Sequence, residues 1–117
     1  MIDFEKMQGL VPAVVIDDDT GEVLMLGFMS EASLILTQQR GYLTFYSRTR
    51  RTLWTKGETS GNRLEVVSLT TDCDRDSVLA RVRVEGQGLV CHLGTRSCFT
   101  ETIPLGDSET LTVSKQV

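Results

Sequence analysis

Short apolar runs and turn-forming residues alternate along the first part of the chain. Residues 11–16 and 22–28 are runs of mainly β-branched and aliphatic residues, and residues 17–21 between them read Asp-Asp-Asp-Thr-Gly. Aspartate, threonine and glycine favour tight turns, so the pattern predicts a β-hairpin. We interpret the three consecutive aspartates as a solvated turn rather than a metal site.

Residues 30–40 have the pattern of a helix. Ser30 is a suitable N-cap, and Gly41 can end the helix in the left-handed conformation. The helical period places Leu34 and Ile35 toward the core and Gln38 at the edge of the buried face. We assign this helix a structural role.

Three further segments, residues 42–47, 64–70 and 78–84, are predicted strands. In the last of these, small or β-branched apolar residues occupy every second position from Val78 to Val84, which indicates one buried face. Several strands with one clear helix predict an α+β, mostly β fold in a single domain, residues 1–117. Few apolar residues follow Pro104, so residues 104–117 are expected to form a loosely attached tail or an edge strand.

The composition is that of an ordinary globular domain. Hydrophobic residues make up 40% of the 117 positions and charged residues 24%, which excludes wholesale disorder. The net charge of −4 argues against a general nucleic-acid-binding surface. The N-terminal residues lack a basic region followed by an apolar core, and no apolar run approaches the roughly 20 residues of a membrane span. We therefore expect a cytoplasmic protein that binds neither nucleic acid nor membrane.

Positive charge is concentrated in one segment. Residues 48–63 contain five arginines or lysines and one glutamate, a net charge of +4 that leaves −8 for the rest of the chain. A basic segment on an acidic protein indicates a local anion site. Within it, residues 54–62 combine a cation, hydroxyls and two glycines, so backbone amides could approach a phosphate. The spacing is not that of a Walker loop, and an ordinary glycine-rich surface loop stays an open alternative.

The three cysteines raise a question of chemistry. An odd number in a cytoplasmic protein is more consistent with free thiols or metal ligands than with a disulfide framework. Cys73, Cys91 and Cys98 are separated by eighteen and seven residues, which fits neither a paired zinc knuckle nor the nucleobase-deaminase signature. Buried structural cysteines and zinc ligands therefore both stay open. Three thiolates without a fourth protein ligand would suit a catalytic zinc, whose remaining position holds water.

An acidic run surrounds the first cysteine. Asp72, Asp74 and Asp76 alternate with Cys73 and Arg75. Carboxylates suit magnesium and a thiol suits zinc, and neighbouring carboxylates repel one another unless a cation compensates them. In an ideal strand the aspartates would face one side and the thiol the other, so two metals would lie on opposite sides. The pattern does not decide between a strand and a loop.

His92, the only histidine, directly follows Cys91. A single histidine is often a hydrogen-bonded structural residue. Its position beside a candidate ligand favours a chemical role, either as a fourth metal ligand or as a proton carrier.

Four segments together resemble the successive signatures of the phosphoribosyl-AMP cyclohydrolase family. They are residues 47–50 (Ser-Arg-Thr-Arg), 53–62 (Leu-Trp-Thr-Lys-Gly-Glu-Thr-Ser-Gly-Asn), 72–76 (Asp-Cys-Asp-Arg-Asp), and 91–92 (Cys-His) followed by 97–99 (Ser-Cys-Phe). The early hairpin at residues 21–26 is similar too, so the resemblance spans about residues 9–99 in the family's order. Departures at residues 87–90, Leu93 and Tyr46 remove no proposed metal ligand.

The resemblance implies roles for individual residues. The zinc ligands would be Cys73, Cys91 and Cys98, and the magnesium ligands Asp72, Asp74 and Asp76. The substrate-binding residues would be Arg48, Arg50, Trp54, Lys56, Gly57, Glu58, Ser60, Gly61 and Asn62. The family's fold is a folded, barrel-like mixed sheet, and its closely associated homodimer assembles zinc sites from both subunits.

The resemblance also implies an enzyme activity. It is a zinc-dependent hydrolase of histidine biosynthesis that opens the adenine ring of 1-(5-phosphoribosyl)-AMP, a small nucleotide, at the N1–C6 bond. Water activated by zinc would attack C6. Three thiolates leave the zinc site with a net charge of −1, so the water is acidified less and a protein base is needed; His92 is the candidate. The rivals are a non-catalytic zinc module that stabilises an interface and a redox pair of Cys91 and Cys98, which lacks the C-x-x-C pattern.

Overall fold

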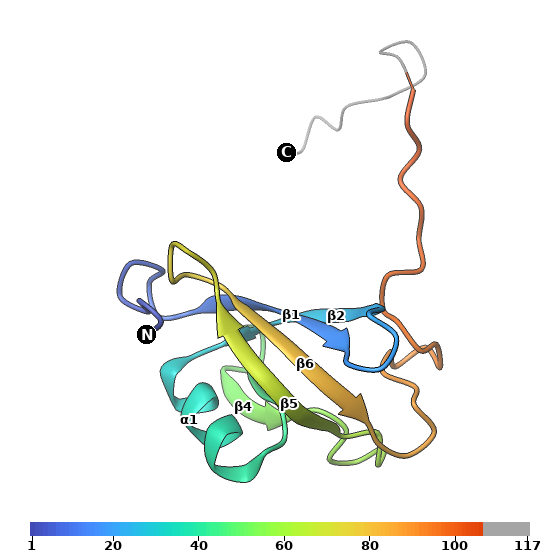
Figure 1. The fold of residues 1–117 in the computed structure, drawn as a ribbon, viewed down its shortest axis with the longest axis horizontal. Helices are drawn as coiled ribbons and strands as arrows, with labels where there is room; N and C mark the ends of the chain where they lie inside the picture. The colour runs from blue at the N-terminus through green and yellow to red at the C-terminus, as the bar shows by residue number, and fades with distance from the viewer. Residues whose placement is uncertain (107–117) are drawn as a thin grey trace.

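The computed structural model describes residues 1–106 and contains six strands and one helix (Figure 1). The strands are β1 (Val11–Asp17), β2 (Val23–Met29), β3 (Thr44–Ser47), β4 (Thr52–Thr55), β5 (Leu64–Thr71) and β6 (Val78–Val84), and helix α1 is Glu31–Arg40. Four strands form one sheet in the order β2-β1-β6-β5, while β3 and β4 form a two-stranded sheet. The prediction of an α+β, mostly β fold with one clear helix is confirmed.

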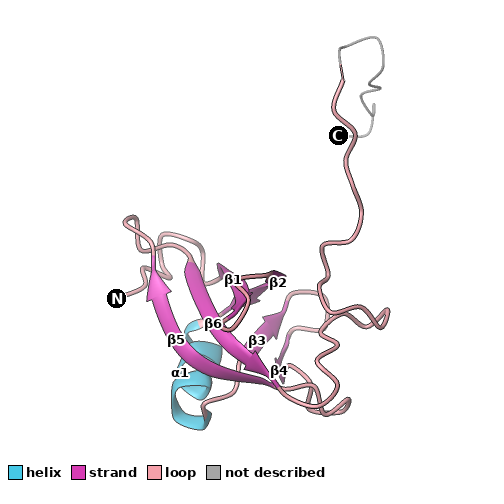
Figure 2. Cartoon of the chain, turned by 45° about the vertical axis from the view of Figure 1, so that its right-hand side comes forward, coloured by secondary structure: helices cyan, strands magenta, loops and turns pink. Residues whose placement is uncertain are grey.

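The four-stranded sheet is mixed, because β1 pairs antiparallel with β2 and parallel with β6, while β5 and β6 are antiparallel. Helix α1 and the β3–β4 hairpin lie on the same side of it (Figure 2). In residues 1–106, β2 and β5 are the two edge strands and the sheet stays open. The expected barrel-like closure is therefore wrong for this chain, because β3 and β4 pair with each other instead of joining the edge strands β2 and β5.

Helix α1 begins and ends where the sequence predicts. The Ser30 hydroxyl accepts a hydrogen bond from the backbone N–H of Ser33 at 3.2 Å, and the Ser33 hydroxyl accepts one from the Ser30 N–H at 2.9 Å. These two bonds form a capping box. Gly41 follows the helix with φ +79° and donates its N–H to the carbonyl of Thr37 at 2.9 Å.

The buried face of α1 differs from the predicted one. Its buried residues are Ser33 and Thr37, whereas Leu34 is partly buried and Ile35 is 44% exposed. Hydrogen bonds explain the difference: the Thr37 hydroxyl bonds to the Ser33 carbonyl at 2.8 Å and accepts from the backbone N–H of Thr44 at 2.9 Å. These hydrogen bonds offset the cost of burying the Thr37 hydroxyl, and they join the helix to β3.

The core lies between the four-stranded sheet, α1 and β3. Every second residue of β1 is fully buried, and the alternation predicted for residues 78–84 is confirmed, since Val78, Ala80 and Val82 are buried. On the opposite face of the sheet, Leu26 and Leu79 each pair with Val14 across a neighbouring strand and are 45% and 36% exposed. This face therefore presents apolar side chains to solvent.

Two parts of the chain lie outside the predicted pattern. The sequence did not predict β4, because Thr52–Thr55 is short and flanked by basic residues. Residues 101–106 are exposed, without helix or strand, and extend away from the sheet (Figure 1). The predicted tail or edge strand, residues 104–117, lies largely outside the described residues. Within residues 1–106, no helix has the length and apolar character to cross a membrane.

Candidate functional site

A cleft of about 490 Å³ opens between the end of β2, the β3–β4 hairpin and the loop that follows β6. Five of the residues expected at the site line it: Arg48, Arg50, Trp54, Lys56 and His92. The structure thus brings the basic segment and the single histidine together, although about forty residues separate them in the chain. A second cleft of about 390 Å³, between the N-terminal residues, α1 and β5, has mainly apolar walls and none of the residues expected to carry chemistry.

Aromatic rings support two of the cations in the larger cleft. The Arg48 guanidinium carbon lies 3.9 Å from the centre of the Phe28 ring, and the Lys56 ammonium lies 5.7 Å from the centre of the Trp54 ring. Trp54 in turn packs against the fully buried Phe45, with ring centres 5.2 Å apart. Cation–π contacts fix the cations without neutralising them, so both remain available to an anion.

Phe28 was missed by reasoning from sequence. It belongs to an apolar run that the sequence interprets only as strand, and nothing local indicates that its ring meets Arg48. The neighbouring Gly27 shows the same non-local constraint: a Cβ at this position would lie 2.6 Å from the Phe45 ring. Absence of a side chain at Gly27 therefore lets β3 approach β2 beside the cleft.

The turn formed by residues 57–62 supports the site from outside the cleft. Glu58, Ser60 and Gly61 are exposed, and neither they nor Gly57 and Asn62 are among the cleft-lining residues. Gly57 has φ +80°, and a Cβ there would lie 2.2 Å from the carbonyl oxygen of Asn62. This close turn explains why residue 57 is a glycine.

Asn62 links this turn to the segment that leads to the second cysteine. Its side chain is only 9% exposed, and its Oδ1 accepts a hydrogen bond from the backbone N–H of Gln87 at 2.8 Å. The Ser60 hydroxyl accepts a hydrogen bond from the Asn62 N–H at 3.2 Å. Ser60 and Asn62 thus have structural contacts in this structure, which stabilise the turn of residues 57–62 and hold it against the loop that contains Gln87.

Cys91 and Cys98 lie on one loop, and their thiols are close enough to interact. The loop is closed by two backbone hydrogen bonds of 3.0 Å, from Gly94 N–H to the Cys91 carbonyl and from Cys91 N–H to the Thr95 carbonyl. Cys98 N–H donates to the Leu24 carbonyl on β2 at 2.7 Å. The folding of this loop thus brings together the thiols of two cysteines that are seven residues apart, next to the cleft residue His92.

The two thiols differ in acidity. Hydrogen bonds from the backbone of Leu93 and the side chain of Thr95 lower the pKa of the Cys91 thiol. Partial desolvation of its sulfur, and then the neighbouring Cys91, raise the pKa of the Cys98 thiol, although Cys98 as a residue is exposed. Cys91 is therefore the thiol that deprotonates first.

Cys73 is at the other end of the sheet. It lies on the turn between β5 and β6, before the start of β6, whereas Cys98 is bonded to Leu24 at the end of the sheet where β6 finishes. The seven residues of β6 span about 20 Å at the usual rise per residue. The three cysteines therefore do not meet within one chain. Two adjacent thiols fit zinc as an incomplete set, which a third thiolate from elsewhere would complete.

The acidic run forms a turn rather than a strand. Within residues 1–106, Asp72, Asp74 and Asp76 are the one group of three candidate metal-binding side chains, each offering a carboxylate oxygen within 4.8 Å of the others. The Asp72 carboxylate accepts the backbone N–H groups of Asp76 and Ser77 at 3.0 and 3.3 Å, and the first of these bonds lowers the pKa of Asp72. Converging hard oxygens fit magnesium.

Lys6 also contacts this turn, which no local pattern indicated. Its ammonium lies 3.2 Å from an Asp76 carboxylate oxygen and donates to the Asp74 carbonyl at 3.0 Å. The carboxylates are thus partly compensated by a cation from the N-terminal segment.

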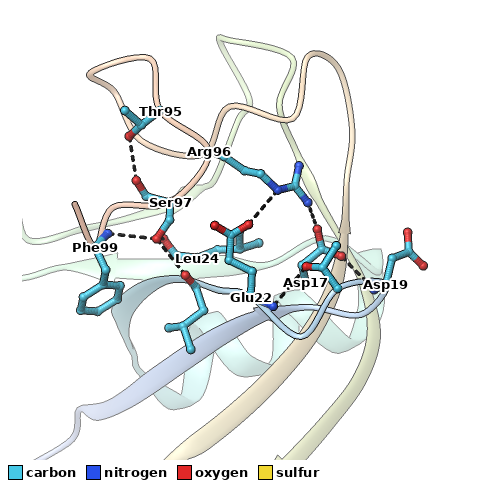
Figure 3. A network of polar contacts seen from close by, with 10 residues as sticks. Asp17, Asp19, Glu22, Leu24, Thr95, Arg96, Ser97 and Phe99 are labelled. Atoms are coloured by element: carbon cyan, nitrogen blue, oxygen red, sulfur yellow. Dashed lines mark hydrogen bonds and ion pairs between the residues drawn. The ribbon is translucent and has the colours of Figure 1, made fainter.

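The interpretation of residues 17–19 as a solvated turn is wrong for the first aspartate. Asp17 is only 3% exposed and forms an ion pair with Arg96, which also bonds to Glu22 at 2.9 Å (Figure 3). Asp18 pairs with Arg81 at 2.9 Å, and Asp19 is exposed. Arg96 was missed as a site residue because its carboxylate partners lie more than seventy residues earlier in the chain.

Known proteins share these sequence features. The family model for phosphoribosyl-AMP cyclohydrolase matches residues 25–100. A phosphoribosyl-AMP cyclohydrolase of Citrifermentans bemidjiense is 54% identical over 98 residues, which cover 84% of this chain and 78% of the relative. One of Geobacter metallireducens is 53% identical with the same coverage.

The similarity extends to longer proteins. The histidine biosynthesis bifunctional protein HisIE of Xanthomonas axonopodis pv. citri is 53% identical over 98 residues, which cover 84% of this chain but only 47% of that protein. The family match runs from within β2 to the end of the loop that carries Cys91 and Cys98, and it includes the cleft and the turn that carries Cys73. The chain therefore belongs to the phosphoribosyl-AMP cyclohydrolase family.

Proposed function

We propose that this chain hydrolyses the adenine ring of phosphoribosyl-AMP in histidine biosynthesis, using zinc and magnesium. The observation that carries the proposal is the cleft, which unites Arg48, Lys56 and His92 next to the paired thiols of Cys91 and Cys98. A merely structural zinc module has no need of two cations and a histidine in one cleft. A redox pair would also use the neighbouring thiols of Cys91 and Cys98, but it lacks the C-x-x-C pattern and has no need of the cations in the cleft.

The substrate determines what the cleft has to do. A phosphoribosyl group on N1 makes the ring cationic and C6 electrophilic. Water adds to C6, the N1–C6 bond breaks, N1 leaves with a proton, and the water oxygen stays on C6 as the carbonyl of a carboxamide. The protein must therefore hold two phosphates, remove a proton from water and return one to N1.

The cleft residues can perform these tasks. Arg48 and Lys56, each on an aromatic ring, are positioned to bind phosphate oxygens. His92 is exposed and lines the cleft, so its imidazole can take a proton from the attacking water and deliver it to N1. Trp54 also lines the cleft, where its indole can contact the base.

The metal donors would complete this arrangement. Zinc, held by Cys91, Cys98 and a third thiolate, would supply a Lewis acid for the attack on C6. Magnesium, held by Asp72, Asp74 and Asp76, would supply positive charge for phosphate oxygens. No other group within residues 1–106 fits this second ion as well.

A homodimer would supply the third thiolate. Cys73 is exposed and about one strand length from Cys91 and Cys98 in its own chain, so we propose that it completes the zinc site of a partner subunit. The exposed apolar side chains of Leu26 and Leu79 on the open sheet face are compatible with such an interface. The cytoplasmic location stays a prediction from the sequence.

The test is ring opening by the purified chain. We expect conversion of phosphoribosyl-AMP to the carboxamide product, loss of conversion after zinc is removed by a chelator, and recovery when zinc is added back. Product formation is followed by absorbance and confirmed by mass spectrometry. Full activity of a protein shown to be metal-free would refute the zinc proposal, and absence of conversion by zinc-loaded protein would refute the activity.

A further inference from the structure

The loop that carries Cys91 and Cys98 has no helix or strand of its own to hold it. Its internal hydrogen bonds close the turn around Gly94, and the Val90 N–H reaches the Arg96 carbonyl at 3.3 Å. The loop must therefore be attached to the sheet by contacts from outside. One attachment is the strand edge of β2, where the Ser97 hydroxyl donates to the Val23 carbonyl at 2.8 Å.

The second attachment is the Arg96 side chain (Figure 3). Its guanidinium pairs with two carboxylates of the β1–β2 hairpin, through one terminal nitrogen with Asp17 and through Nε with Glu22 at 2.9 Å. A planar guanidinium can bridge two acceptors in fixed directions, which an ammonium cannot. Arg96 thereby fixes the loop in two directions at a point between the two cysteines.

Asp17, the buried carboxylate that pairs with Arg96, is held in place by hydrogen bonds within the β1–β2 hairpin. Asp17 is 3% exposed, its other oxygen accepts the Asp19 N–H at 2.8 Å, and its backbone bonds to Glu22 and Gly21 at 2.9 and 2.8 Å. Without Arg96, this buried charge would lack its cationic partner. The buried Asp17 therefore requires a cation where the Arg96 guanidinium lies.

A glycine leaves room for the same side chain. A Cβ at Gly88 would lie 3.1 Å from Nη1 of Arg96, and Gly88 has φ +75°. The guanidinium thus lies between Gly88 and the hairpin, with 43% of the Arg96 side chain exposed. Of its two carboxylate partners, Asp17 is buried and Glu22 is exposed.

We propose that Arg96 is a positioning residue for the paired thiols: anchored on Asp17 and Glu22, it keeps Cys91 and Cys98 next to each other, as two ligands of one metal ion must be. The idea rests on the proposed zinc site for its purpose, but the geometry it asserts exists without zinc. Residues that support metal ligands from outside commonly change metal affinity by about 10- to 100-fold when they are replaced.

The decisive measurement is the cross-linking of the two thiols. In a Cys73→Ser background, a bis-alkylating fluorogenic reagent bridges Cys91 and Cys98 only while they are held together. Arg96→Met should slow bridging about tenfold, because the thiols lose their fixed proximity, while single alkylation by iodoacetamide stays unchanged. Arg96→Lys should give an intermediate rate, because lysine keeps the positive charge but lacks the planar guanidinium that contacts both carboxylates.

Matched variants separate positioning from general stability. Arg83→Met removes an exposed ion pair with Glu65 at 3.4 Å and should alter neither rate. Glu22→Gln removes the charge of the exposed carboxylate that pairs with Arg96 and leaves Asp17 in place. This variant remains informative if Arg96→Met does not fold, and it should also slow bridging. Wild-type bridging rates in folded Glu22→Gln and Arg96→Met would overturn the proposal.

Zinc affinity provides a second readout in the full, otherwise native chain. Competition with a chelating dye should show a zinc Kd raised about 10- to 100-fold in Arg96→Met. If the native chain itself binds no zinc, the zinc part of the proposed function fails, while the bridging rates still decide the role of Arg96. An unchanged zinc Kd together with an unchanged bridging rate would leave Arg96 with a structural role only and refute the inference.

Discussion

The separation between Cys73 and the other two cysteines makes the two-subunit zinc site testable by mixing two inactive variants. Cys73→Ala and Cys98→Ala should each abolish ring opening, because each removes one of three proposed zinc ligands. The two residues are at opposite ends of β6, about 20 Å apart along the strand, so no side-chain movement can join them in one chain.

The expected recovery follows from counting sites in a symmetric dimer. In a mixed dimer, one site receives both lesions, and the other receives Cys73 from the Cys98→Ala subunit and the intact pair from its partner. Random exchange makes about half of the dimers mixed, and one of two sites is intact in each. About a quarter of wild-type activity should therefore return.

The assay is ring opening before and after subunit exchange, with exchange verified by mass spectrometry of differently tagged subunits. The matched control mixes Cys91→Ala with Cys98→Ala, whose lesions lie on the same loop, so every site stays defective and no activity should return. If the Cys73→Ala and Cys98→Ala mixture stays inactive after verified exchange, the shared site is refuted, although the zinc chemistry is not.

Three other variants test single residues. His92→Ala should keep its zinc and lose about 100-fold or more in turnover, the usual scale of acid–base help; loss of zinc from this variant would instead make His92 a ligand. Phe28→Leu should raise the KM for phosphoribosyl-AMP roughly 2- to 30-fold, the range that corresponds to a cation–π contact, because Arg48 loses its ring; steady-state kinetics with an unchanged KM would contradict this. Thr37→Val should lower the free energy of unfolding by about 1–3 kcal/mol in urea titrations, since the Thr44 N–H loses its acceptor in the core, and a loss below about 0.5 kcal/mol would show that this bond is dispensable.

Elements that depend on local chemistry were predictable from sequence. The β1–β2 hairpin follows from turn residues between apolar runs, and α1 follows from Ser30 and Gly41 at its ends. The alternation in residues 78–84 identified the buried face of β6. In each case the determining residues lie within a few positions of one another, so a local pattern suffices.

Features that depend on distant residues were not predictable in the same way. The helix buries Thr37 instead of Ile35 because β3 offers a backbone N–H to its hydroxyl. Asp17 is buried because Arg96 arrives from the far end of the chain. Thr37 and Thr44 are only seven residues apart, but the helical period does not show that the backbone N–H of a following strand will bond to the Thr37 hydroxyl. Asp17 and Arg96 are 79 residues apart, so no local pattern contains both of them.

The two proposed metal sites differ in the same respect. The carboxylates of Asp72, Asp74 and Asp76 come from five consecutive residues, and one tight turn is enough to make them converge. The thiols of Cys91 and Cys98 need a loop fastened to the β1–β2 hairpin before they form a pair, and the third thiol is beyond the reach of its own chain. If these sites are as proposed, folding of a single chain is sufficient for the magnesium donors, whereas the zinc donors would require folding, the Arg96 anchor and then assembly of two subunits. A catalytic centre built this way would open the ring only after the chain has folded and found its partner.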